Sequence, residues 1–119
     1  MKQILILVIS SFLISNTYAQ KFISKKQHIN TVNNQYIETN DNMFFVVQGE
    51  KVMVTNKKGD KIYEEFNLGE TKRGDVIVKY SINQVNESTT GKKELVRRSK
   101  DTFTEKTSKI VYELDEILN

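Results

Sequence analysis

The sequence predicts an all-β protein, an antiparallel up-and-down meander that forms a small barrel or a sandwich. Glycines followed by an acidic residue recur ten residues apart, at Gly49, Gly59 and Gly69. A glycine beside an acidic residue is typical of a tight turn, because glycine adopts positive φ without steric cost. The segments between these glycines are short and rich in β-branched and aromatic residues. Short strands with turn signals about every 8–12 residues indicate an antiparallel sandwich or barrel.

Residues 1–19 have the pattern of a cleaved signal peptide. A basic residue precedes an apolar run over residues 4–14, and Thr17 and Ala19 precede the expected cleavage site at the usual spacing. The apolar run has 11 residues, whereas a helix needs about 20 to cross a bilayer, so a retained anchor is the weaker alternative. We therefore expect an exported protein, periplasmic or extracellular, with a single β domain over residues 20–119 and no transmembrane segment.

The composition excludes several kinds of site. The 119 residues contain no Cys and one His, which excludes disulfides, thiol nucleophiles, zinc fingers and a cysteine-linked lipid anchor. A single His also argues against multi-histidine metal centres and Ser–His–Asp catalysis. The net charge of +3 is small for a nucleic-acid binder, in which Lys and Arg crowd one face. We predict no catalytic residue, metal site, cofactor or nucleic-acid partner.

Strands are expected between the turn signals. The candidate strands cover residues 27–30, 35–38, 43–47, 51–55, 61–66 and 76–82, and a further strand begins at residue 95. The segment over 43–47 is apolar at every position, so both of its faces should be covered. In the segment over 76–82 the apolar residues alternate, which places Val76, Val78, Tyr80 and Ile82 on one buried face.

Glu64 conflicts with the pattern of its own strand. Ile62, Glu64 and Phe66 share one strand parity, which would direct the Glu64 carboxylate into the interior. An unpaired buried carboxylate is costly, whereas β-bulges are common. The sequence therefore favours a bulge that shifts the register, or a tolerant edge strand, over a buried Glu64 carboxylate.

The C-terminal segment over residues 108–118 is compatible with two structures. Its apolar residues fit one face of a helix, but Ile110, Tyr112 and Leu114 also share strand parity. Threonines upstream disfavour a long helix. We favour a final hairpin in which residues 102–105 pair with residues 109–114.

Three groups of polar residues are best explained without a catalytic or metal-binding role. His28 has no nucleophile or orienting partner near it in the sequence, so we expect a surface or edge-strand histidine. The segment over 38–42 alternates oxygen ligands as a calcium loop does, but lacks the required Gly and Glu, which favours a plain polar turn. Glu64 and Glu65 would point to opposite faces of a strand and cannot form a local dyad.

Two sets of residues are candidates for binding. The apolar side chains predicted to line the interior, and to contact an apolar small molecule or lipid, are Phe44, Val46, Val54, Val78 and Tyr80. The cations of the densest basic segment are Lys92, Lys93, Arg97 and Arg98. Lysines on an edge strand block aggregation, and this is the favoured interpretation of the basic segment. The alternative is that this edge binds an anionic partner or another envelope protein.

The C-terminal quarter of the expected domain carries a resemblance. Residues 95–104 read Leu-Val-Arg-Arg-Ser-Lys-Asp-Thr-Phe-Thr, and residues 109–114 read Lys-Ile-Val-Tyr-Glu-Leu. This resembles the last strands of small secreted lipocalin-like domains of the calycin type, in which a ser-x-asp-thr turn joins two strands and a tyr-x-leu strand ends the chain. The resemblance implies an apolar small-molecule pocket without catalysis. We therefore expect a binding module, with an envelope structural or protein-interaction module as the alternative.

Overall fold

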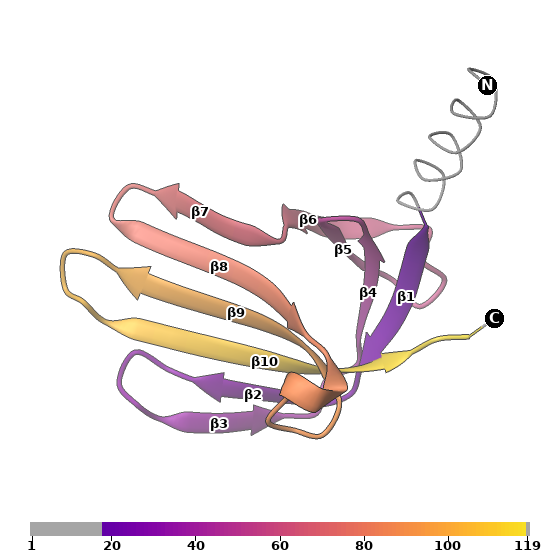
Figure 1. Cartoon of the computed structure of the whole chain (residues 1–119), viewed down its shortest axis with the longest axis horizontal. Coiled ribbons are helices and arrows are strands. Elements are labelled where there is room, and N and C mark those ends of the chain that lie inside the picture. The colour runs from indigo at the N-terminus through magenta and orange to yellow at the C-terminus, as the bar shows by residue number, and fades with distance from the viewer. Residues whose placement is uncertain (1–17, 119) are drawn as a thin grey trace, which may run out of the picture.

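The computed structural model describes residues 18–118 and shows an antiparallel all-β protein (Figure 1). The strands are β1 (Ala19–Ser24), β2 (Gln27–Asn30), β3 (Tyr36–Thr39), β4 (Met43–Gln48), β5 (Lys51–Thr55), β6 (Ile62–Asn67), β7 (Gly69–Arg73), β8 (Val76–Asn83), β9 (Lys93–Asp101) and β10 (Thr107–Glu116). One 3₁₀ turn, η1 (Val85–Glu87), lies between β8 and β9. Among residues 18–118, no helix is long and apolar enough to cross a membrane. The predicted signal peptide lies almost wholly outside the described residues.

The ten strands form one sheet in the order β6-β5-β4-β1-β10-β9-β8-β7, with β2 paired to β10 and β3 paired to β2. The predicted all-β antiparallel fold is confirmed, and the sheet is not closed into a barrel. Its two end strands, β6 and β7, are consecutive and are separated only by Leu68. Because β6 pairs with β5 and β7 pairs with β8, the chain itself connects the two ends of the sheet.

β1 and β2 lie one after the other along the same edge of β10. Phe22 and Ile23 in β1 face the end of β10, and β2 pairs with residues 109–112. The corner between β1 and β2 is held by Gln27, whose side-chain amide donates to the Ser24 and Asp41 carbonyls at 3.2 and 2.8 Å. The segment over 38–42 therefore ends β3 and connects it to β4 as a polar turn.

Two of the three evenly spaced glycines lie in hairpin turns. Gly59 has φ of 79°, and its N–H donates to the carbonyl and the side chain of Asn56 at 3.0 and 2.8 Å. Gly69 instead begins β7 with φ of 105°. The sequence signal at Gly69 therefore marks the junction at which the chain leaves β5 and turns towards β8.

The predicted bulge is confirmed in β6. Val54 lies opposite Glu64, and Thr55 lies opposite Ile62. Tyr63 is the extra residue between these pairs. Glu64 keeps the parity of Phe66, and it is exposed because β6 is an end strand of the sheet. An exposed carboxylate needs no buried partner, so the conflict in the strand pattern is removed.

The C-terminal segment is a strand, as favoured, but its partner differs from the expected one. β10 pairs with β9 over residues 93–100, and residues 102–106 form the turn between them. The Asp101 carboxylate accepts the N–H groups of Phe103 and Thr104 at 2.9 and 3.1 Å. Because these bonds close the turn, the threonine-rich segment is not available for a strand ladder.

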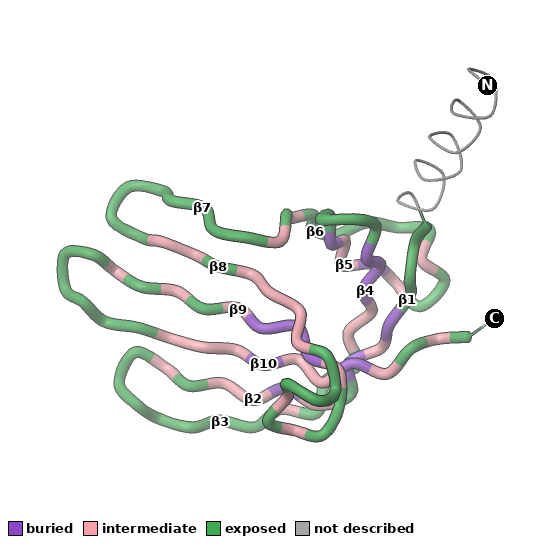
Figure 2. The backbone as a smooth tube through the Cα atoms, in the orientation of Figure 1, coloured by how far each residue is buried: buried purple, intermediate pink, exposed green. Residues whose placement is uncertain are grey.

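The apolar core lies at one end of the sheet, where β1, β4 and β5 meet the start of β9 and the end of β10 (Figure 2). Its buried cluster consists of Phe22, Phe45, Val47, Val52, Leu95 and Leu114. The opposite end, called the distal end below, comprises residues 28–38, 69–80 and 97–110, none of which is buried. The distal strands are therefore held mainly by their backbone ladders.

One buried carboxylate holds the loop over residues 84–92 against the core. Glu94 is 1% exposed, and it accepts hydrogen bonds from Asn83, from the N–H and hydroxyl of Thr89 and from the N–H of Thr90, at 3.0 to 3.3 Å. Burial raises the pKa of Glu94, but the hydrogen bonds from Thr90, Asn83 and Thr89 outweigh it and hold that pKa below its ordinary value.

We predict that Phe45→Ala lowers the free energy of unfolding by about 3–5 kcal/mol, because Phe45 is 2% exposed and its loss leaves a cavity in the core. Phe103→Ala is the matched control. Phe103 is 86% exposed, so we expect a change within about 0.5 kcal/mol. Urea denaturation followed by circular dichroism measures both, and equal losses would contradict this location of the core.

We predict that stability falls in acid partly through Glu94. The stabilisation from its lowered pKa is fully present above about 4.5, the ordinary value, and is lost as the pH falls through the native pKa. Glu94→Gln should cost about 1–3 kcal/mol at neutral pH, and the difference from wild type should shrink in acid. Urea denaturation across this pH range measures it, and parallel pH profiles for the two proteins would disprove the role of Glu94.

Candidate functional site

The apolar residues predicted to line one interior are divided between two faces in β4. Phe45 and Val47 belong to the core cluster, and Val54, directly opposite Phe45, packs against it. Phe44 and Val46 alternate with Phe45 along β4 and point to its other face. The structure therefore brings Val54, but not Phe44 or Val46, to the face that carries the core.

Val78 and Tyr80 lie on the core-side face of β8. The Tyr80 ring stacks on Phe66 with 3.9 Å between the ring centroids, and the Tyr80 hydroxyl accepts a hydrogen bond from Arg97 Nε at 3.2 Å. Val78 lies two residues further from the core and is half-buried. The space beside Tyr80 is thus occupied by the protein's own aromatic ring.

The four basic residues singled out in the sequence have different environments. Lys92 pairs with Asp115 at 3.2 Å, and Lys93 Nζ lies 4.9 Å from the ring centroid of Phe22. β9 is paired on both sides, to β8 and to β10. Arg97 and Arg98 therefore lie in the middle of the sheet and do not form a basic edge. The two arginines also point to opposite faces, because they are adjacent in a strand.

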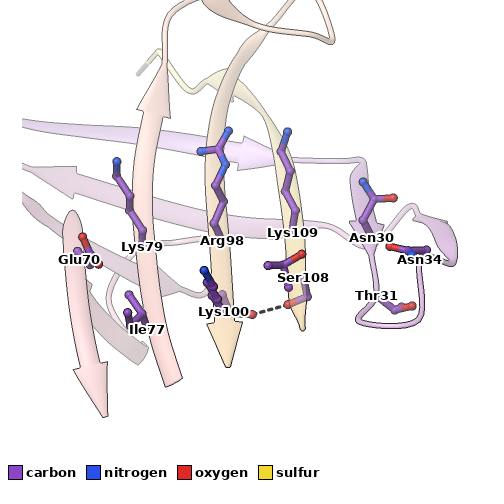
Figure 3. A pocket seen from close by; sticks show the side chains of 12 residues that line it. Asn30, Thr31, Asn34, Glu70, Ile77, Lys79, Arg98, Lys100, Ser108 and Lys109 are labelled. Carbon is purple, nitrogen blue, oxygen red and sulfur yellow. Dashed lines mark hydrogen bonds between the residues drawn. The ribbon is translucent and has the colours of Figure 1, made fainter. Parts of the chain in front are cut away.

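Arg98 belongs to an open groove of about 850 Å³ at the distal end (Figure 3). The floor of the groove is formed by β8, β9 and β10, and its margins by Glu70 of β7 and by Asn30 and Thr31 at the end of β2. Eleven of its twelve lining residues carry a polar or charged group, and Ile77 is the one apolar side chain. The groove therefore offers a ligand hydrogen-bonding groups and charge beside the aliphatic stems of its long side chains.

Three cations form a row across the groove floor. Lys79 lies directly opposite Arg98, and Arg98 lies directly opposite Lys109. Figure 3 shows these three side chains extending in the same direction along their strands. The row ends at Glu70, opposite Lys79, and at Asn30, opposite Lys109. Within residues 18–118, none of the three cations lies within 4.0 Å of a carboxylate oxygen.

This basic row is unfavourable for folding. Paired strands are about 4.8 Å apart, and like charges directly opposite each other in a sheet destabilise it. Lys79, Arg98 and Lys109 make two such contacts side by side, and Glu70 opposite Lys79 offsets part of the repulsion at one end of the row. An anion bound over Arg98 would add attractions to the three cations that offset both repulsions. The row is thus a site whose electrostatics improve when a ligand is present.

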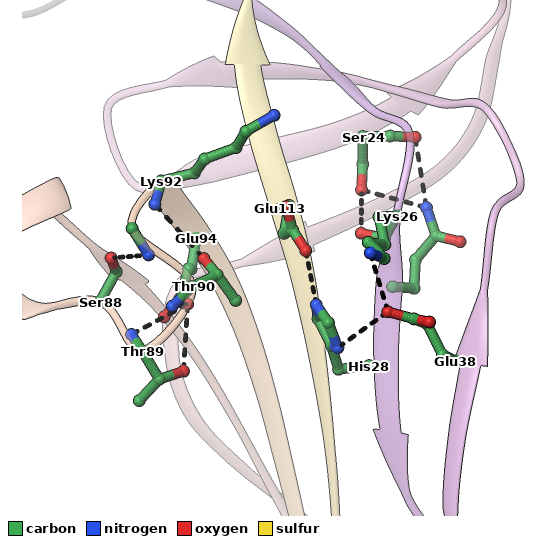
Figure 4. Close-up of polar contacts among 12 residues, drawn as sticks. Ser24, Lys26, His28, Glu38, Ser88, Thr89, Thr90, Lys92, Glu94 and Glu113 are labelled. Carbon is green, nitrogen blue, oxygen red and sulfur yellow. Dashed lines mark hydrogen bonds and ion pairs between the residues drawn. The ribbon is translucent and has the colours of Figure 1, made fainter.

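A second polar cluster borders the groove around His28 (Figure 4). His28 Nε2 lies 2.5 Å from Glu113 Oε2, and His28 Nδ1 contacts the Tyr36 hydroxyl. Glu38 lies opposite His28 and pairs with Lys26 at 3.0 Å. The hydrogen bond and charge of Glu38 raise the pKa of Lys26 above its ordinary value. Both imidazole nitrogens are engaged, so the cluster links β2 to β3 and β10.

Sequence reasoning missed the partners of His28. One signal was present, because residues 27–30 and 35–38 were both expected to form strands, and a hairpin between them brings Glu38 close to His28, as the observed pairing shows. Glu113 is 85 residues away in the chain, and no local pattern indicates that contact. Within residues 18–118, no group of three or more His, Asp or Glu side chains is arranged to hold a metal ion.

No known protein family, curated protein or solved structure matches this chain. The resemblance to lipocalin-like domains therefore stays a prediction, and the function is argued from the geometry of the groove.

We predict that Arg98→Gln stabilises the protein by about 0.2–1 kcal/mol, because it removes both like-charge contacts in the row. Lys58→Gln, in an exposed turn remote from the groove, is the control and should leave stability unchanged. Urea denaturation at low and at about 0.5 M ionic strength measures the difference in stability between the variant and wild type. Because salt screens the repulsion in wild type, the difference should be smaller at the higher ionic strength. A destabilised Arg98→Gln protein would contradict the proposed electrostatic cost.

Proposed function

We propose that the protein is an exported, non-catalytic binding protein whose ligand carries a compact anionic group, a carboxylate, phosphate or sulfate. The observation that supports the proposal is the row of three cations without carboxylate partners on the groove floor. No function is needed to explain a single exposed lysine. Three adjacent cations that repel one another in a groove are difficult to explain by solubility alone.

The row suits an anion with several oxygen atoms. The Arg98 guanidinium is planar and forms two parallel hydrogen bonds to a carboxylate or phosphate. Lys79 and Lys109 flank it on the neighbouring strands, each about 4.8 Å away, and contact the outer oxygens as point charges. The Asn30 amide at the end of the row offers a neutral hydrogen-bond donor.

The groove determines the size and polarity of the ligand. Its volume of about 850 Å³ lies in the range of small-molecule sites. Ile77 supplies a limited apolar contact and Glu70 repels a second anion at the β7 margin. Among the ligand classes expected from the sequence, a lipid with an anionic head group fits better than a wholly apolar molecule.

We predict that a triple variant, Lys79→Gln/Arg98→Gln/Lys109→Gln, binds small anions about tenfold or more weakly than wild type, because charge-assisted hydrogen bonds are lost. Isothermal titration calorimetry with phosphate, sulfate, citrate and glycerol phosphate measures the affinity. The matched control, Lys25→Gln/Lys57→Gln/Lys58→Gln, removes the same charge from exposed positions outside the groove. Equal losses in both variants, or no binding of any of these anions by wild type, would overturn the proposal.

A further inference from the structure

The turns at the distal end expose apolar side chains. Phe103, in the turn between β9 and β10, is 86% exposed, and Val32, in the turn between β2 and β3, is 47% exposed. Figure 1 shows that these two turns and the turn between β7 and β8 project at the same end of the molecule, away from the core. An aromatic side chain at such a position is in contact with water unless a partner covers it.

The turn that carries Phe103 is well ordered by hydrogen bonds. Its own N–H donates to the Asp101 carboxylate at 2.9 Å. The N–H and hydroxyl of Thr102 both donate to the Asp75 carbonyl, at 2.7 and 2.9 Å, which links this turn to the one between β7 and β8. Phe103 is therefore presented by two joined turns, and little conformational freedom remains to be lost on binding.

The distal end also accounts for the net charge of the protein. It contains eight Lys and Arg residues and five Asp and Glu residues, a surplus of three. The formal net charge of the whole chain is +3, so the rest of the molecule is balanced. At the turns themselves, Arg73 and Lys106 are accompanied by Asp75 and Glu105. The surplus therefore lies on the strands behind the turns, which carry the basic row.

We propose that the distal end docks on the surface of an anionic lipid bilayer, with Phe103 inserted among the head groups and Arg73 and Lys106 against the lipid phosphates. Aromatic side chains favour the membrane–water interface, and basic residues close to the surface of an anionic leaflet are attracted to it. The positive surplus is spread over β7, β8, β9 and β10 behind the turns, which suits an extended anionic surface. This inference goes beyond the proposed function, because the groove binds a small anion with or without a membrane.

The test uses Phe103→Trp as a reporter, since the protein contains no other Trp. We expect its emission to shift to the blue, and to be quenched by brominated lipid, with vesicles of phosphatidylglycerol and phosphatidylcholine but not with phosphatidylcholine alone. Tyr63→Trp, on β6 and 62% exposed, is the matched control and should show neither change. Both proteins carry the same N-terminal segment, so its affinity for lipid contributes equally.

Vesicle co-sedimentation of variants completes the test. Phe103→Ala should weaken binding about tenfold, and Arg73→Gln/Lys106→Gln should weaken it about fivefold per charge. Lys57→Gln/Lys58→Gln removes the same charge elsewhere and should bind as wild type does. All five substituted positions are exposed, so circular dichroism should show intact folds.

The outcomes distinguish this inference from the proposed function. Equal emission shifts at positions 103 and 63, or no shift with anionic vesicles, would overturn membrane docking. Titration with phosphate in the same experiment tests the groove separately, because Phe103, Arg73 and Lys106 do not line it. Phosphate binding without vesicle binding would therefore overturn the docking alone, and vesicle binding without phosphate binding would overturn the function proposed for the groove alone.

Discussion

The burial of Phe22 against Phe45 is the interaction on which the rest of the structure depends. These residues lie directly opposite each other in β1 and β4, and both are 2% exposed. β1 joins the β4 side of the sheet to β10, yet its ladder with β10 has only two residue pairs. So short a ladder is a weak connection, and the apolar side chains reinforce it. The ring of Phe45, 5.3 Å from that of Tyr112 in β10, spans this junction.

A core at one end of the sheet leaves the other end without a second layer. The distal strands are therefore exposed to water and carry charged side chains, which need no buried partners there. Exposure permits charge, but it does not require three like charges in adjacent positions. Lys79, Arg98 and Lys109 lie directly opposite one another, and we expect their repulsion to lower the stability of the sheet that holds them. An arrangement of side chains that opposes folding, as these like charges do, is expected at functional sites.

Local patterns were sufficient for most of the strands. The strands expected at residues 27–30 and 35–38 are β2 and β3, and the bulge beside Glu64 follows from strand parity and the cost of burying charge. The signal at Gly69 was misread as a hairpin turn, because glycine permits positive φ equally at a turn and at a bend between collinear strands. The basic segment was assigned to an edge for a related reason. A strand's own residues do not show whether β9 has one neighbour or two.

The sequence by itself determined the all-β class, the position of most strands and turns, and the lack of cysteine chemistry. These properties depend on the period of two and on the preferences of single residues, which act over a few positions. Only the tertiary structure decided which cations share a face and that His28 meets Glu113. Those relations depend on the pairing of β9 and β10 with strands far away in the chain. Pairing of distant strands closes a long loop of chain, which costs entropy, and burial of the shared apolar core offsets that cost. No local sequence pattern encodes this balance.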